Sequence, residues 1–89
     1  MNEENNEEIY KAFSIKFYNL LKNTINASVN CTVDKEDKMH IVIGRLGLEY
    51  KTSISNVSRL IDNTSEMEKE FDKLIKRYRT YVLKKYFYD

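Results

Sequence analysis

The spacing of apolar residues changes twice along this chain of 89 residues. Steps of three and four residues place side chains on one face of an α-helix, whereas strict alternation places them on one face of a strand. The helical spacing extends from residue 7 to about residue 26, alternation follows from 27 to 54, and the helical spacing returns after residue 57. We therefore expect a helix, then a group of strands, then a second helical region.

The second helical region is expected to contain a break. Residues 57–61 fit a short helix, which Asn63 would end in the left-handed conformation. Ser65 and Glu68 have the spacing of a capping box, so the last helix is expected to begin at Glu66. The apolar stripe of the first helix is predicted to contain Ile9, Phe13, Phe17, Leu20, Leu21 and Ile25. That of the last helix is predicted to contain Met67, Phe71, Leu74, Ile75, Tyr78, Val82 and Tyr86.

The alternating region predicts three strands, over residues 27–33, 39–43 and 48–54. A charged segment separates the first two strands and is typical of a turn. The apolar positions change from odd to even numbers between Gly44 and Gly47, which are the only glycines. A tight turn at this point explains both observations, because glycine adopts the positive φ that hairpin turns require. One long strand with a bulge is the alternative.

Short connections between these elements favour antiparallel neighbours. We predict an α+β fold with the order α-β-β-β-α-α, in which helices pack on one face of a three-stranded antiparallel sheet. A single domain, 1–89, is expected, with residues 1–6 frayed. A reversal at residues 63–65 would place the basic end of the last helix beside the acidic start of the first. The open face of the sheet is expected to expose Asn30, Thr32, His40, Glu49 and Lys51.

The composition argues against several classes of function. A net charge of +1 steers the chain toward neither nucleic acid nor an acidic membrane. The single cysteine, Cys31, cannot form an internal disulfide, and it is expected to face the core as a small apolar side chain. An acidic start and the lack of long apolar runs predict a cytoplasmic protein without a membrane segment. With one histidine and no glycine-rich loop, we expect no catalytic residues, no metal and no cofactor.

Nucleic-acid binding is the first alternative. The segment 73–85 carries six lysine and arginine residues, no carboxylate and two interleaved tyrosines. Basic residues beside stackable rings are typical of single-strand binders, although cations also stabilise the last turns of any helix. The candidate residues for nucleic-acid binding are Lys73, Lys76, Arg77, Lys84 and Lys85.

The order of elements resembles that of the double-stranded-RNA-binding domain and of the small toxin ribonucleases built on the same fold. The resemblance covers the topology of most of the chain and no motif. That family grips phosphate with paired lysines at the start of its final helix, where this chain has Glu66, Glu68 and Glu70. The toxin ribonucleases use a histidine on a strand as the base, which would assign that role to His40. The sequence shows no acidic or orienting partner for His40, so RNA cleavage is the second alternative.

A second apolar stripe, away from the predicted core, favours protein binding. Exposed Leu, Phe, Ile and Tyr beside Arg have the composition of an interface. We therefore expect a small non-enzymatic interaction module, a regulator or inhibitor that binds another protein or a second copy of itself. A specific version is a phage-encoded inhibitor of a host nuclease or defence complex, similar in topology to small anti-CRISPR proteins. The candidate residues for partner binding are Ile15, Tyr18, Lys76, Arg79, Leu83 and Phe87.

Overall fold

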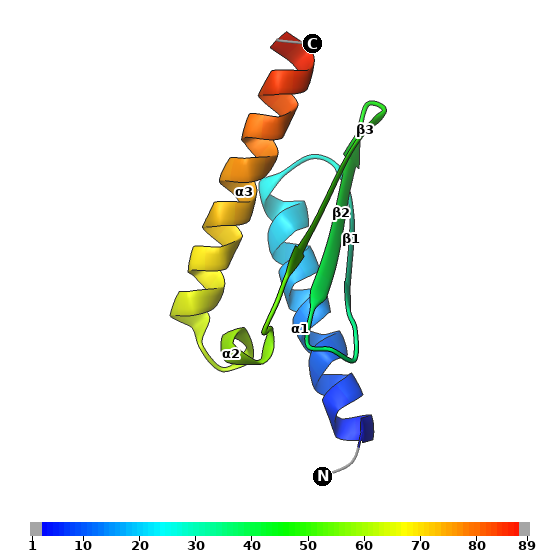
Figure 1. Cartoon of the computed structure of the whole chain (residues 1–89), viewed down its shortest axis with the longest axis vertical. Helices are drawn as coiled ribbons and strands as arrows, with labels where there is room; N and C mark the ends of the chain where they lie inside the picture. Colours follow the sequence, from blue (N-terminus) through cyan, green and yellow to red (C-terminus); the bar gives the residue numbers. More distant parts are fainter. Residues whose placement is uncertain (1–2, 88–89) are drawn as a thin grey trace. The chain divides into compact units, whose positions relative to one another are not determined.

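The computed structural model describes residues 3–87 and has the predicted α+β fold, with the element order α-β-β-β-α-α (Figure 1). It forms two compact units, one up to Val57 and one from Ser58 onward. The first unit contains α1 (Glu3–Thr24), β1 (Ser28–Val33), β2 (Met39–Arg45) and β3 (Leu48–Ile54). The second unit contains α2 (Ser58–Ile61) and α3 (Thr64–Phe87).

The sheet is antiparallel and open, with β2 between β1 and β3. β1 pairs with β2 from Ser28↔Gly44 to Val33↔Met39, and the register has no interruption. β2 pairs with β3 from Met39↔Ile54 to Arg45↔Leu48. β1 and β3 are therefore the two edges of the sheet.

The two faces of the sheet differ as the alternation predicts. On one face, the side chains of Met39, Ile41 and Ile43 in β2 are completely or almost completely buried. All five residues expected on the other face are exposed, which confirms that prediction: Asn30, Thr32, His40, Glu49 and Lys51. Burying the apolar face stabilises the sheet by about 25 cal/mol for each Å² of apolar surface removed from water.

Helix α1 packs against β1 and buries Phe13, Phe17 and Leu21. The rings of Phe13 and Phe17 lie 6.1 Å apart, in a tilted arrangement. The prediction that Ile9 belongs to this buried stripe is wrong, because its side chain is 47% exposed. Each step of four residues rotates a side chain by about 40° around a helix, so Ile9 lies about 80° away from Phe17, beyond the buried face. The helix also begins at Glu3, earlier than the expected residue 7.

The predicted tight turn joins β2 to β3, which rules out the single long strand. Its two central residues are Leu46 and Gly47, with φ of 51° and 83°, the signs of a type I′ turn. Gly44 was expected in the turn but lies inside β2. A side chain there would meet β1, because a Cβ would lie 3.1 Å from Ser28 Oγ. The Ser28 hydroxyl donates to the Gly44 carbonyl across the pair at 3.1 Å.

The second unit has the expected break between two helices, but its capping differs from the prediction. Asn63 caps the start of α3: its Oδ1 accepts the backbone N–H of Glu66 at 3.1 Å, and its carbonyl accepts that of Met67 at 3.0 Å. Asn63 is thus an N-cap and not a left-handed helix end, because an Asn at this position satisfies free amides of the first turn. The N-cap is Asn63 and not Ser65, so α3 begins at Thr64, two residues before the expected Glu66.

The apolar stripe of α3 follows the prediction except at its end. Met67, Leu74, Ile75 and Tyr78 are buried, and Phe71 and Val82 are half-buried. Tyr86 was predicted in this stripe but is 47% exposed, because it lies in the last turn of the helix. The expected antiparallel placement of the last helix against the first stays a prediction.

Candidate functional site

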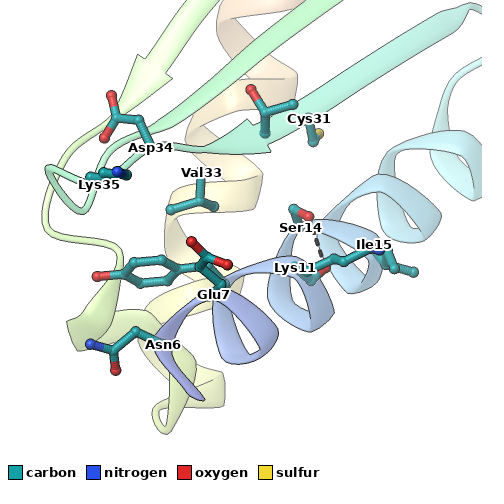
Figure 2. Close-up of a pocket in the computed structure, with 11 residues that line it drawn as sticks. Asn6, Glu7, Lys11, Ser14, Ile15, Cys31, Val33, Asp34 and Lys35 are labelled. Carbon is teal, nitrogen blue, oxygen red and sulfur yellow. Dashed lines mark hydrogen bonds between the residues drawn. The ribbon is translucent and has the colours of Figure 1, made fainter. Parts of the chain in front are cut away.

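A pocket of about 820 Å³ opens between the first half of α1 and the end of β1 (Figure 2). Its walls are mixed in chemistry: Glu7 and Lys11 from α1 face Asp34 and Lys35 from the turn after β1. Neither sign of charge prevails, so the pocket does not select a charged small molecule. The Ser14 hydroxyl donates to the Lys11 carbonyl at 2.8 Å, which is an ordinary hydrogen bond within a helix.

The thiol of Cys31 lies in the wall of this pocket on the half-buried face of β1. Burial raises its pKa from 9.0 to about 11, so the thiol is neutral at physiological pH. A nucleophilic cysteine needs a nearby cation or histidine that lowers the pKa. The environment of Cys31 acts in the opposite direction, as expected of a small apolar side chain.

His40 has an acidic partner that the sequence analysis missed. Its Nε2 lies 2.7 Å from Oδ2 of Asp34, and both side chains are exposed to solvent. The register explains the pair: Thr32 is opposite His40, and the Asp34 N–H donates to the Lys38 carbonyl at 2.9 Å. Asp34 is therefore the diagonal neighbour of His40 on one face of the sheet. The sequence could have indicated this pair, because Asp34 follows Thr32 by two residues and alternate residues of a strand lie on the same face.

The other carboxylate oxygen of Asp34 stabilises the turn. Its Oδ1 accepts the backbone N–H groups of Glu36 at 2.8 Å and Lys38 at 3.2 Å. The hydrogen bond with His40 is the main cause that lowers the pKa of Asp34, and the two backbone N–H groups add to it. The carboxylate of Asp34 therefore orients the imidazole of His40 and also stabilises the turn that joins β1 to β2.

Lowering pH is expected to remove the contribution of Asp34 to stability. A carboxylate whose pKa is lower in the folded state stabilises the fold above its unfolded pKa of about 3.9. This contribution is lost as pH falls through the folded value. Asp34→Asn should therefore lower the melting temperature at pH 6, and the difference from wild type should shrink below about pH 4. Thermal unfolding followed by circular dichroism from pH 2.5 to 7 measures it.

Asp72→Asn is the matched control for the change of charge. Asp72 is exposed on α3 and makes no hydrogen bond or ion pair with residues 3–87. Its variant should stay close to wild type at pH 6. An Asp34→Asn difference that is unchanged at pH 3 would show that the carboxylate does not act through its charge.

Exposed apolar residues gather at the end of α3, as the off-core stripe predicts. The side chain of Leu83 is 52% exposed and that of Phe87 is 73% exposed, and the exposed Tyr86 lies beside Phe87. Lys76 lies two turns before Leu83 and Arg79 one turn before it, and both are exposed as well. We call Leu83, Tyr86 and Phe87 the α3 apolar end.

The other predicted partner-binding residues lie on α1. Ile15 is 51% exposed at the wall of the pocket, and Tyr18 is 37% exposed one turn later. They belong to the first unit, whereas the α3 apolar end belongs to the second. Both sets are thus accessible at the surface of their own units.

The basic segment of α3 is exposed at all five predicted positions: Lys73, Lys76, Arg77, Lys84 and Lys85. Lys73, Arg77 and Lys84 recur at steps of four and seven, so they share one side of the helix. At the start of this side of α3, an acidic side chain forms ion pairs with neighbouring basic side chains. Glu70 lies 3.6 Å from Lys73 and 3.3 Å from Arg59, which joins α2 to α3. The start of this side is therefore an ion-paired surface.

Two kinds of site are not found in the part of the chain that the structure describes. No three His, Cys, Asp or Glu side chains between residues 3 and 87 come together as metal ligands would. None of the helices within these residues combines the length and the apolar character needed to span a bilayer.

Comparison with protein-family models, with curated proteins and with solved structures finds no match to this chain.

Proposed function

We propose that this protein is a non-enzymatic interaction module that binds another protein through the α3 apolar end. The observation that supports this is the exposure of three large apolar side chains, Leu83, Tyr86 and Phe87, within the last turns of one helix. Burying such side chains against a partner stabilises a complex by about 1.5 to 3 kcal/mol for each fully buried side chain. Tyrosine and arginine are also enriched among residues that dominate binding energy.

The chemistry of this surface specifies its partner. Lys76 and Arg79 are exposed on the same side of α3 as Leu83, and Lys84 follows it directly. The complementary surface is an apolar hollow with acidic side chains at its rim. The protein would act as a regulator or inhibitor by covering that surface. A finer version of the proposal is that a phage-encoded inhibitor covers a host nuclease or defence complex in this way.

Cross-linking followed by affinity measurement tests this proposal. A photoreactive residue in place of Thr80 should cross-link the partner, and the purified pair should then be measured by calorimetry. Leu83→Glu and Phe87→Glu should each weaken binding at least about thirtyfold, the effect of losing a dominant contact of about 2 kcal/mol. Arg77→Glu changes an exposed charge on another side of α3 and should change affinity less than about threefold. Equal affinities of wild type, Leu83→Glu and Phe87→Glu would contradict the proposal.

Nucleic-acid binding is the alternative that the exposed cations of α3 support. If it is correct, titration with labelled RNA or DNA at 50 and 200 mM salt should show binding that weakens steeply, because salt competes with phosphate contacts. Arg77→Glu and Lys84→Glu should then abolish binding, whereas Leu83→Glu should not. The two proposals thus predict opposite effects of Arg77→Glu and Leu83→Glu on binding.

RNA cleavage is the second alternative, and the pairing of His40 with Asp34 supports it. A carboxylate hydrogen-bonded to an imidazole orients the ring, as a general base requires. Loss of an observed cleavage activity in both His40→Ala and Asp34→Asn, with folding intact, would establish this reading. If the purified protein cleaves no RNA, the pair has the structural role of closing the β1–β2 hairpin.

A further inference from the structure

Three residues of β1 direct their backbone hydrogen-bonding groups toward the free edge of the sheet. The Asp34 N–H donates to the Lys38 carbonyl, so this pair is hydrogen-bonded. Hydrogen-bonded pairs alternate along an antiparallel ladder, and the even-numbered residues of β1 therefore bond to β2. Val29, Cys31 and Val33 point the other way, and their backbone groups have no partner among residues 3–87.

The free edge of β1 lacks the features that usually prevent pairing with another chain. Edge strands are commonly protected by charged side chains, proline or a bulge. β3, the other edge, carries Glu49 and Lys51, whose charged atoms lie 3.4 Å apart. β1 contains no charged residue and no proline, and its register is continuous. Among residues 3–87, a side chain covers this edge just before the strand, where Lys22 Nζ donates to the Ala27 carbonyl at 2.7 Å.

The core-facing side chains of β1 are also incompletely covered. Val29, Cys31 and Val33 are only half-buried, whereas their direct neighbours in β2 are completely or almost completely buried. Helix α1 packs against β1 but leaves the pocket of Figure 2 open beside Cys31 and Val33. An additional strand at this edge would therefore bury apolar surface as well as satisfy backbone groups.

We propose that a second copy of this chain occupies the β1 edge, with the two β1 strands antiparallel around a two-fold axis at Cys31. The sheets of the two copies would then be continuous. In this register Cys31 lies opposite Cys31 of the second copy and Val29 lies opposite Val33, so both backbone groups of all three residues are paired. A shift by two residues would leave either Val33 or Val29 opposite a residue outside β1, according to the direction of the shift. A shift by one residue would place side chains of opposite faces of the sheet next to each other.

The side chains of β1 are compatible with this register. On the exposed face, Asn30 lies opposite Thr32 of the second copy, and these uncharged polar side chains do not repel one another. The dimer is isologous, as most soluble homodimers are. This proposal does not depend on the α3 apolar end.

A charge-pattern experiment tests both the interface and its register. Asn30→Lys with Thr32→Lys places lysine opposite lysine twice across the axis, whereas Asn30→Glu with Thr32→Lys places glutamate opposite lysine twice. Sedimentation equilibrium from 1 μM to 1 mM should show a concentration-dependent dimer for wild type. The dissociation constant should be at least about tenfold higher for the lysine pair than for the glutamate and lysine pair.

Amide hydrogen exchange provides an independent readout. Exchange at Val29, Cys31 and Val33 should slow as protein concentration rises, whereas exchange of exposed helix amides should not change. Leu83→Glu and Phe87→Glu should leave this dimer intact, which separates it from partner binding by the α3 apolar end. A wild type that is monomeric at 1 mM, or a dimer with equal dissociation constants in both double variants, would overturn the proposal.

Discussion

Phe17→Ala is expected to leave the protein largely unfolded at room temperature. The side chain of Phe17 on α1 is completely buried, beside the ring of Phe13. Truncation of a buried phenylalanine costs about 3 to 5 kcal/mol, because apolar contacts are lost and a cavity remains. A domain of this size has a total stability on the order of 5 kcal/mol, so little is left to hold the fold. Urea unfolding followed by circular dichroism at a fixed protein concentration measures the change.

Ile15→Ala is the matched control, because it removes apolar atoms from an exposed position two residues earlier in the same helix. It should change the free energy of unfolding by less than about 0.5 kcal/mol. Phe17→Leu should fold and lose about 1 to 2 kcal/mol, so the prediction stays measurable if the alanine variant does not fold. Equal losses at positions 15 and 17 would mean that α1 buries a different face.

The thiol of Cys31 is expected to react with iodoacetamide about a hundredfold more slowly than an ordinary cysteine thiol at pH 7.5. Burial raises its pKa from 9.0 to about 11, so the reactive thiolate is rarer by about two powers of ten. Its rate should still increase about tenfold for each pH unit up to pH 10. Mass spectrometry of quenched time points measures the rate.

Thr32→Cys in a Cys31→Ser background is the control for Cys31. Position 32 is exposed on the opposite face of the same strand, so a thiol introduced there should react at about the rate of the denatured protein. Denaturation of wild type in guanidinium should restore the fast reaction of Cys31. If Cys31 in the native wild type reacts as fast at pH 7.5 as the thiol introduced at position 32, its thiol is not desolvated.

The elements of this fold follow from local patterns. Alternation in β1, β2 and β3 assigned each residue to a face, and the exposure of Asn30 and Lys51 confirms it. The tight turn before β3 was evident from the change of phase beside Gly47. These features were predictable because a helix or a strand repeats at a fixed period, which the side chains of that segment record directly.

Boundaries and caps were less predictable. Ser65 and Asn63 are both suitable N-caps, and the hydrogen bond from the Glu66 N–H to Asn63 Oδ1 distinguishes them. Ile9 satisfied the spacing of the buried stripe, but whether a side chain rotated about 80° away from Phe17 is still covered depends on the elements that pack against α1. Such choices depend on neighbouring elements, and the spacing alone does not record them.

The candidate sites also differ in whether local spacing or contacts between distant segments determine them. The spacing of residues along α3 was enough to identify the side chains that lie away from its apolar stripe, including Leu83 and Phe87, because rotation around one helix is a local property. In contrast, the assembled sheet was needed to show that Asp34 reaches His40, and that β1 is an edge strand whose outer backbone groups have no partner among residues 3–87. Both depend on the order and register of strands. These are set by contacts between residues far apart in the chain, where the periodicity of one segment carries no information.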